Sequence, residues 1–412
     1  MTSRLIKTVA ATLATAALAA FPLSAFASVS QPTLSEAAVS SVHTPRGALV
    51  SAVSIAHLTA AQLDAAATDF EGTPPARYGV TVYRLIYRTI DVNGRPTTAS
   101  GIVVLPDGRR GALTAAEYLH GTNATKAYAA SVDGTSTDRL VTALFAGAGL
   151  VGVAPDYLGL GFGPGLHPYF DTKTETSASV DMLLAARTFA AKHGITLKRD
   201  VLVTGFSQGG RASIAFGRAL TRGEAGPFRL GDLRAVAGPY DLLGSELPAT
   251  FDGRVLPQTA AFYLAYFVTA WNRTVGLYDD PREAFQAPYA QTIEGLFDGS
   301  HPDEEVFGAL PDSPQKLFTP QFLQRLEHPT GRFRQALRQA DQVCKDWTPR
   351  VPVHLYSGTK DTDVVAVNAD VCATDLRARG AHVTVHSMGA VDHFGTSFAA
   401  YPQIVREFAR RA

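Results

Sequence analysis

The chain has 412 residues, of which 46% are hydrophobic and 18% are charged, so it can bury a large core and is not disordered as a whole. This length suits a large α/β enzyme, or one core that carries a substantial insertion. The formal net charge at pH 7 is zero and Lys and Arg form no long basic block, which argues against a nucleic-acid partner.

Residues 1–27 have the pattern of a secretory signal peptide. Arg4 and Lys7 supply a positive start, and a nearly uncharged apolar run follows over residues 8–20. The sequence Ala-Phe-Ala that ends at Ala27 then predicts cleavage before Ser28. A membrane anchor is the alternative, but the apolar run is short for a membrane span. The mature protein is therefore predicted to be soluble and secreted, either periplasmic or extracellular.

The chain after the signal begins with a segment of small and polar residues. Residues 28–75, rich in Ala, Ser and Thr, are predicted to wrap the main domain rather than to form a separate one. Two runs enriched in Val, Ile, Tyr and Thr follow at 78–90 and 96–105, with Asn93-Gly94 between them. Asn-Gly between two such runs predicts a β-hairpin.

Strands and helices then alternate along the chain, which predicts a mostly parallel sheet with helices on both faces. The alternation stops near residue 240 and resumes near 351, and the stretch between is aromatic and helical. We therefore predict an α/β core over 76–240 and 347–412, with a helical cap inserted at 241–346. Strands are predicted at 113–119, 150–154, 200–206, 233–237, 351–356 and 381–387, and helices at 135–146, 175–193, 208–222, 364–379 and 394–410.

One G-x-S-x-G sequence occurs, GFSQG at residues 205–209. It lies between a predicted strand and a predicted helix, which is the setting of a nucleophile elbow in an α/β-hydrolase fold. Such a turn strains the serine backbone and excludes bulky residues two positions away on either side, and Gly205 and Gly209 meet that demand. The helix N-terminus adds partial positive charge where an oxyanion would form. We predict that Ser207 is the nucleophile; the alternative is a glycine-rich turn without a catalytic role.

A nucleophilic serine needs a base and an orienting acid, and in this fold the acid and then the histidine follow it in the chain. His393 is the predicted base because it lies between the last strand and the last helix, at the carboxyl edge of the sheet. Asp361 is the predicted acid because it leaves a strand in a glycine-assisted turn, with Asp363 as its rival. Asp392 is interpreted as a loop-capping carboxylate. The other histidines after the serine lie in the insertion or in predicted strands: His301, His328, His354, His382 and His386.

An oxyanion hole requires two backbone N–H groups aimed at one point. Gln208, directly after the serine, is the first predicted donor. The second is expected from the loop 120–123, where Thr122 is favoured over Asn123 because its hydroxyl offers a further donor. His120 precedes the serine in the chain and is predicted to shape this loop rather than to catalyse.

Cys344 and Cys372 are the only two cysteines, and both lie in the part predicted to be exported. In an oxidising compartment such a pair predicts a disulfide, worth about 3 to 4 kcal/mol through its effect on the unfolded chain. Two buried free thiols are the alternative. No His or carboxylate pair has ligand spacing on a convincing element, so neither a metal site nor a cofactor is predicted.

Four further motifs are HGTN at 120–123, APDYxGxG from residue 154, HPY at 167–169 and GFSQGG at 205–210. Together with the predicted signal peptide, they resemble the secretory lipases of the lipase A type and their bacterial relatives, in the α/β-hydrolase superfamily. The resemblance covers about residues 47–412 and is loosest through the cap. It implies ester hydrolysis by Ser207, Asp361 and His393 beneath a helical cap, on acylglycerols or shorter esters.

The leading interpretation is therefore a secreted serine carboxylesterase or lipase (EC 3.1.1 class) that acts on a small-molecule or lipid ester. The aromatic run at 262–268 fits an acyl pocket and a transient contact of the cap with a lipid interface, or equally the core of a helical cap. A serine aminopeptidase would use acidic cap residues such as those at 279–280 or 304–305 to hold an amine. A non-catalytic binding protein would be expected to lack a triad member. No obligate protein partner is implied.

Overall fold

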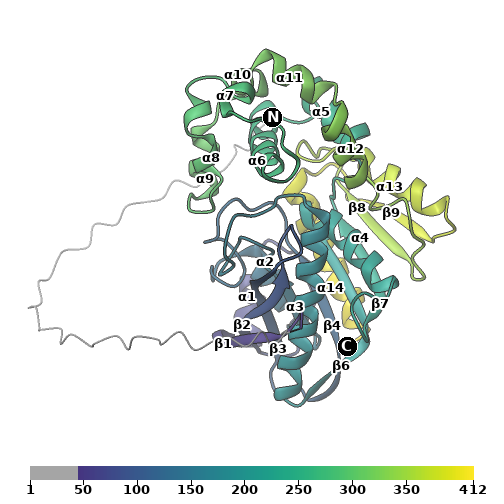
Figure 1. Cartoon of the computed structure of the whole chain (residues 1–412). Coiled ribbons are helices and arrows are strands. Elements are labelled where there is room, and N and C mark those ends of the chain that lie inside the picture. Colours follow the sequence, from purple (N-terminus) through teal and green to yellow (C-terminus); the bar gives the residue numbers. More distant parts are fainter. Residues whose placement is uncertain (1–44) are drawn as a thin grey trace, which may run out of the picture. The chain divides into compact units, whose positions relative to one another are not determined.

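The computed structural model describes residues 45–412, so the predicted signal peptide at 1–27 and the first part of the segment 28–75 lie outside the described residues. Within the described part, nine strands form one sheet in the order β1-β2-β3-β5-β4-β6-β7-β8-β9 (Figure 1). Strands β1, β2 and β3 pair antiparallel, β3 pairs antiparallel with β5, and all remaining pairs are parallel. The strands are β1 (Leu49–Leu58), β2 (Val80–Ile90), β3 (Pro96–Pro106), β4 (Gly111–Leu119), β5 (Val151–Pro155), β6 (Ile195–Phe206), β7 (Arg229–Val236), β8 (Val353–Ser357) and β9 (Val383–Ser387).

The predicted hairpin is confirmed as β2 and β3, whose register runs from Val80 opposite Pro106 to Ile90 opposite Pro96. Gly94 has a φ of 75° in the connecting turn, a conformation that glycine adopts without steric cost. The described part of the segment before the hairpin supplies the edge strand β1 and the short helix α1 (Ala60–Ala66). This segment therefore extends the sheet at its edge.

Helices cover both faces of the sheet, as the alternation predicted. Helices α3 (Thr172–Lys192), α4 (Gln208–Thr221) and α13 (Val367–Arg377) share one buried core with the strands, and α2 (Thr137–Gly147) and α14 (His393–Ala409) share the other. On the central strand β6, Val201 and Val203 face the first core and Leu202 faces the second, and all three are fully buried. A strand buried on both faces explains why this run is continuously apolar.

Between β7 and β8 the chain forms short helices around one long one, α6 (Pro257–Val275), and these helices lie together at one end of the sheet (Figure 1). They enclose a separate aromatic core. Across residues 45–412, no helix combines the length and the apolar character needed to cross a membrane. The other cap helices are η1 (Leu242–Glu246), α5 (Leu247–Asp252), α7 (Pro281–Ala284), η2 (Tyr289–Gln291), α8 (Ile293–Leu296), α9 (Asp303–Ala309), α10 (Pro314–Leu317), α11 (Pro320–Glu327) and α12 (Gly331–Ala340).

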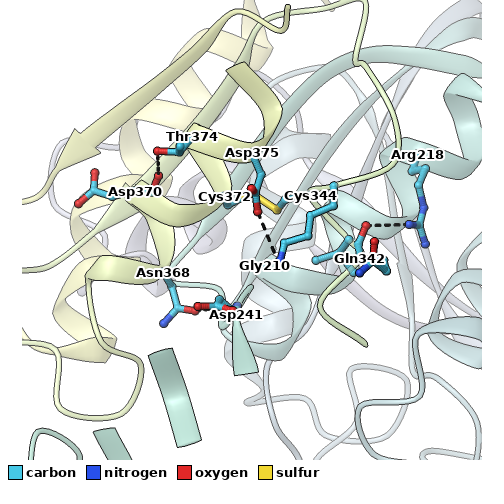
Figure 2. The surroundings of a disulfide bond; sticks show 12 residues. Gly210, Arg218, Asp241, Gln342, Cys344, Asn368, Asp370, Cys372, Thr374 and Asp375 are labelled. Atoms are coloured by element: carbon cyan, nitrogen blue, oxygen red, sulfur yellow. Dashed lines mark hydrogen bonds and ion pairs between the residues drawn. A yellow bond between two sulfur atoms is a disulfide. The ribbon is translucent and has the colours of Figure 1, made fainter. Parts of the chain in front are cut away.

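A disulfide joins Cys344, just after the last cap helix, to Cys372 on α13, as the cysteine pair predicted (Figure 2). Their Cα atoms lie 5.3 Å apart and both residues are buried. In the same region, Arg218 of α4 donates to the carbonyl of Gln342 at 3.1 Å. The end of the cap segment is thus fastened covalently to α13 and by a hydrogen bond to α4.

Candidate active site

Ser207 occupies a sharp turn between the end of β6 and the start of α4, with φ 57° and ψ −122°. A Cβ atom on Gly205 would lie 2.2 Å from the carbonyl oxygen of Gly209, and one on Gly209 would lie 1.9 Å from that of Leu119. Neither position can therefore carry a larger residue without a shift of the backbone. The strained serine and the close glycines are the features expected of a nucleophile elbow.

His393 and Asp361 meet through a buried hydrogen bond, in which His393 Nδ1 lies 2.8 Å from Asp361 Oδ2. The other carboxyl oxygen of Asp361 accepts from the backbone N–H groups of Asp363 and Val364. Burial lowers the pKa of His393, but the hydrogen bond and the charge of Asp361 outweigh it and hold the pKa above its ordinary value. The ring of His393 packs against that of Phe206, 4.6 Å between centroids, directly before the elbow serine. His393 Nε2 is buried and has no hydrogen-bond partner among the described residues, so this is the ring atom available to accept a proton.

The two rival carboxylates have other partners. Asp363 Oδ2 accepts from the hydroxyl of Tyr263 at 3.0 Å. Asp392 caps α14 by accepting from the N–H of Gly395 at 2.7 Å, as its interpretation as a capping residue predicted. His354 on β8 and His386 on β9 bond to each other, while His301 bonds to Glu305 in the cap. His382 directly precedes β9 and does not belong to it, contrary to the sequence-based prediction.

The loop after β4 packs against the elbow, because a Cβ atom on Gly121 would lie 3.4 Å from the Cβ of Ser207. Thr122 lies beside the serine in the wall of a cavity, and its hydroxyl is hydrogen-bonded to that of Tyr169 at 2.7 Å. Asn123 is buried, and its carbonyl accepts from Tyr266 at 3.2 Å. On the other side of the serine, Gln208 is the first residue of α4, so no carbonyl of the helix accepts from its N–H.

Residues directly after β5 contact the loop that follows β4. Tyr157, with φ 64°, packs its ring against that of His120 at a centroid distance of 4.2 Å. Asp156 is buried and accepts from Ser100 Oγ at 2.6 Å and from the N–H of Ser131 at 3.2 Å. His120 thus lies among residues that shape the loop, as predicted for it.

A small cavity of about 90 Å³ opens beside Ser207, between the elbow and the cap. The aromatic run on α6 divides between two roles: Tyr263 and Phe267 line this cavity, while Tyr266 packs in the cap core. Most of the wall is apolar, but two acidic residues, Glu246 and Asp363, are part of it. The lining consists of Thr122, Tyr169, Phe170, Ser207, Pro239, Leu242, Glu246, Leu247, Thr250, Val255, Ala260, Tyr263, Leu264, Phe267, Leu337, Asp363 and Val364.

Glu246 was not singled out in the sequence. Burial raises its pKa to about 8, although the N–H of Val365 (3.1 Å) and the side chain of Asn368 donate to it. Burial also raises the pKa of Asp363. An isolated Glu outside any recognisable motif carries no sequence signal of such a position. Across residues 45–412, no three His, Cys, Asp or Glu side chains form a metal-ligand cluster.

Comparisons with known proteins agree with this architecture. No protein-family model matches the chain, and a search of curated proteins finds no match. A ligand-bound form of the rice cell wall degrading esterase LipA from Xanthomonas oryzae is similar in structure, with a TM-score of 0.76, 27% identity, and coverage of 88% of this chain and 97% of that one. A putative hydrolase from Legionella pneumophila gives a TM-score of 0.78 at 26% identity, covering 88% of this chain and 98% of that one.

Candida antarctica lipase A shares the fold, with a TM-score of 0.59 at 16% identity over 85% of this chain and 78% of that one. The structural neighbours thus include both a lipase A and a bacterial esterase, the two groups that the sequence motifs resemble. The chain has the α/β-hydrolase fold and is similar in structure to lipase- and esterase-type proteins of that fold.

Proposed function

We propose that the protein is a secreted serine carboxylic ester hydrolase that acts through an acyl-enzyme on Ser207, with His393 as base and Asp361 as orienting acid. The observation that carries the proposal is the buried 2.8 Å hydrogen bond between His393 and Asp361 on the loops that adjoin the strained serine turn. The ester hydrolase class is supported by the structural likeness to LipA, an esterase. The disulfide supports export to an oxidising compartment.

The chemistry follows from these positions. His393 Nε2 accepts the proton of Ser207 Oγ as the oxygen attacks the ester carbonyl carbon. The N–H of Gln208 and one from the loop at Thr122 donate to the oxyanion that forms. His393 then gives its proton to the leaving alcohol, and water attacks the acyl-enzyme by the same route. Asp361 remains ionised throughout and stabilises the imidazolium.

The cavity wall argues for an acyl group rather than an amine in this site. The acidic pairs at 279–280 and 304–305, which an aminopeptidase would need, do not line the cavity; Asp280 bonds to Arg282 and Glu305 to His301. Asp363 already accepts from Tyr263, and the raised pKa of Glu246 favours its neutral form. A small and mostly apolar cavity therefore supports esters with short acyl chains. Leu256, exposed at the start of α6, is an apolar side chain through which the cap would contact a lipid surface transiently.

A series of p-nitrophenyl esters from acetate to palmitate, assayed beside an aminoacyl p-nitroanilide, tests this function. We expect kcat/KM to be highest for short acyl chains and the anilide to be inert. Ser207→Ala should lose several orders of magnitude in kcat at unchanged thermal stability, as is found when a serine nucleophile is removed. Ester hydrolysis that survives S207A would overturn the mechanism, and preferred cleavage of the anilide would favour the aminopeptidase.

A further inference from the structure

The side chain of Gln208 is held from two sides, although the proposed reaction requires only its backbone N–H. Its amide nitrogen Nε2 lies 2.8 Å from Glu175 Oε1 and 3.2 Å from His167 Nε2. Glu175 belongs to the first turn of α3, and His167 to the loop before that helix. All three side chains are buried.

The protonation of His167 follows from its surroundings. Its Nδ1 lies 2.8 Å from the carbonyl oxygen of Leu158, which can only accept, so Nδ1 carries a proton. Burial lowers the pKa of His167 to about 3, so the ring is neutral and its Nε2 is an acceptor. The two amide hydrogens of Gln208 are thus both used, one by Glu175 and one by His167. The two bonds determine which way the amide nitrogen points, while Oε1 has no hydrogen-bond partner among the described residues.

Arg211, one helical turn further along α4, reinforces the same attachment. It is fully buried, and its Nη1 lies 3.5 Å from Glu175 Oε2. Its Nη2 donates to Thr172 Oγ1 and to the carbonyl of Ala340, each at 2.8 Å. A buried cation needs such partners to be tolerated. The first turn of α4 is therefore attached by polar side chains to α3 and to the end of the last cap helix, α12.

This attachment lies at a point of the elbow where neighbouring residues lack side chains. Gln208 is followed by Gly209 and Gly210, which have no side chains that could anchor the start of α4. Gln208 is thus the elbow residue after the nucleophile whose side chain can hold the backbone in place. An oxyanion-hole donor contributes most when it is aimed before the reaction begins, because no reorganisation is then needed.

We propose that Glu175 and His167 are positioning residues that act through the Gln208 side chain to aim the Gln208 N–H at the oxyanion. This inference rests on the proposed function, since it assigns a role within the same reaction. The two residues do not touch the substrate. Their loss should therefore reduce transition-state stabilisation and leave substrate binding nearly unchanged.

The direct test is Gln208→Met, which keeps the backbone N–H and the side-chain volume and removes both hydrogen bonds. Complete loss of an oxyanion donor costs about 10²- to 10³-fold in kcat, so a misaimed donor should cost about 10- to 100-fold with KM changed less than about threefold. The affinity for an alkylboronic acid, which forms a tetrahedral adduct with the serine, should fall by the same factor as kcat/KM. If the hydrogen bonds of Gln208 served only to stabilise the fold, kcat/KM and the affinity for the boronic acid would not fall by the same factor.

Double-mutant cycles test whether Glu175 and His167 act through the side chain of Gln208. Glu175→Met and His167→Leu each remove the acceptor that holds the Gln208 amide. Each should lower kcat in the native background and have no further effect in the Q208M background, because they act through Gln208. His167→Gln, which keeps an acceptor near the position of Nε2, should restore most of the activity lost in H167L. Should E175M fail to fold, H167L and H167Q complete the cycle. Glu117→Met is the matched control, since Glu117 is an equally buried carboxyl on β4 outside this network.

Three outcomes would overturn the inference: kcat of Q208M within about twofold of the native value, a loss that appears entirely in KM, or effects of E175M and Q208M that multiply. These outcomes are distinct from failure of the proposed function. A native enzyme that hydrolyses no ester, or an S207A variant that remains active, would overturn the proposed function and this inference with it. An active native enzyme with unaffected variants would overturn this inference alone.

Discussion

His393 and Asp361, 32 residues apart in the chain, are joined by a buried 2.8 Å hydrogen bond at the carboxyl edge of the sheet. Asp361 uses its second oxygen to accept from two backbone N–H groups of its own loop, so the carboxylate is oriented before it meets the imidazole. This leaves Nε2 as the ring atom on which a proton is gained and lost. The bond between the two residues therefore determines which ring nitrogen acts as the base and, through the pKa of His393, the pH range in which it does so.

Activity should depend on pH through His393. Burial lowers the pKa of this residue, but the bond to Asp361 and the nearby carboxylates raise it above 6.5. The base must be neutral, so kcat/KM should rise with pH and reach half of its plateau above pH 6.5. A pH profile of kcat/KM for p-nitrophenyl acetate measures this midpoint. A midpoint below the ordinary histidine value would contradict the assignment.

Asp361→Asn and Asp363→Asn separate the two candidate acids. D361N should lower kcat by about 10³- to 10⁴-fold because the histidine loses the group that stabilises its charged form. D363N removes the bond to Tyr263 in the cavity wall and a charge that affects His393 less than Asp361 does, so it should change kcat far less. Steady-state kinetics of both variants with one ester decide between them, and a larger loss in D363N would reverse the assignment.

Gly209→Ala should disrupt the elbow, since its Cβ would lie 1.9 Å from the carbonyl oxygen of Leu119. The backbone must shift to relieve this clash, which should cost more than about 3 kcal/mol or abolish folding. Gly295→Ala, in a cap helix where a Cβ would meet no atom within 4 Å, is the matched control. Thermal unfolding and ester hydrolysis of both variants test the expectation; a native-like G209A would refute it.

Removal of the disulfide should reduce stability without changing the chemistry. The bond joins residues 28 positions apart, and its loss in C344S/C372S should cost about 3 to 4 kcal/mol by freeing the unfolded chain. Urea unfolding of the double variant, and of the native protein with and without reductant, measures the difference. A reductant effect that persists in the double variant would show that the disulfide is not its cause.

Glu246 should make stability depend on pH. Its pKa in the folded protein is raised from 4.5 to about 8, so the folded state binds the proton more tightly than the unfolded state does. The contribution of Glu246 to stability is therefore greatest at low pH and declines as the pH rises from 4.5 towards 8. Glu246→Gln removes this dependence, so the melting temperature of E246Q should fall less than that of the native protein over this range. An equal fall in both would exclude Glu246 as the source.

Local patterns in the sequence determined the hairpin, the alternating strands and helices, the elbow at Ser207 and the identity of His393 as the predicted base. These features depend on short-range rules: alternation of buried residues, turn residues, and glycines where a Cβ would clash. Boundaries were less well determined, since β6 begins at Ile195 rather than at residue 200. The first half of β6 is less buried and carries charged residues, so it lacks the continuous apolar run that indicates a buried strand.

Tertiary structure alone decided which side chains meet. Asp361 and Asp363 lie on one loop, yet only Asp361 points to His393, while Asp363 bonds to Tyr263 on a cap helix. The aromatic run on α6 likewise divides between the cap core and the cavity, a choice made by which face of the helix packs against its neighbours. The hydrogen bonds that hold the Gln208 side chain come from His167 and Glu175, which are distant from it in the chain. Such contacts depend on long-range packing, which no local pattern encodes.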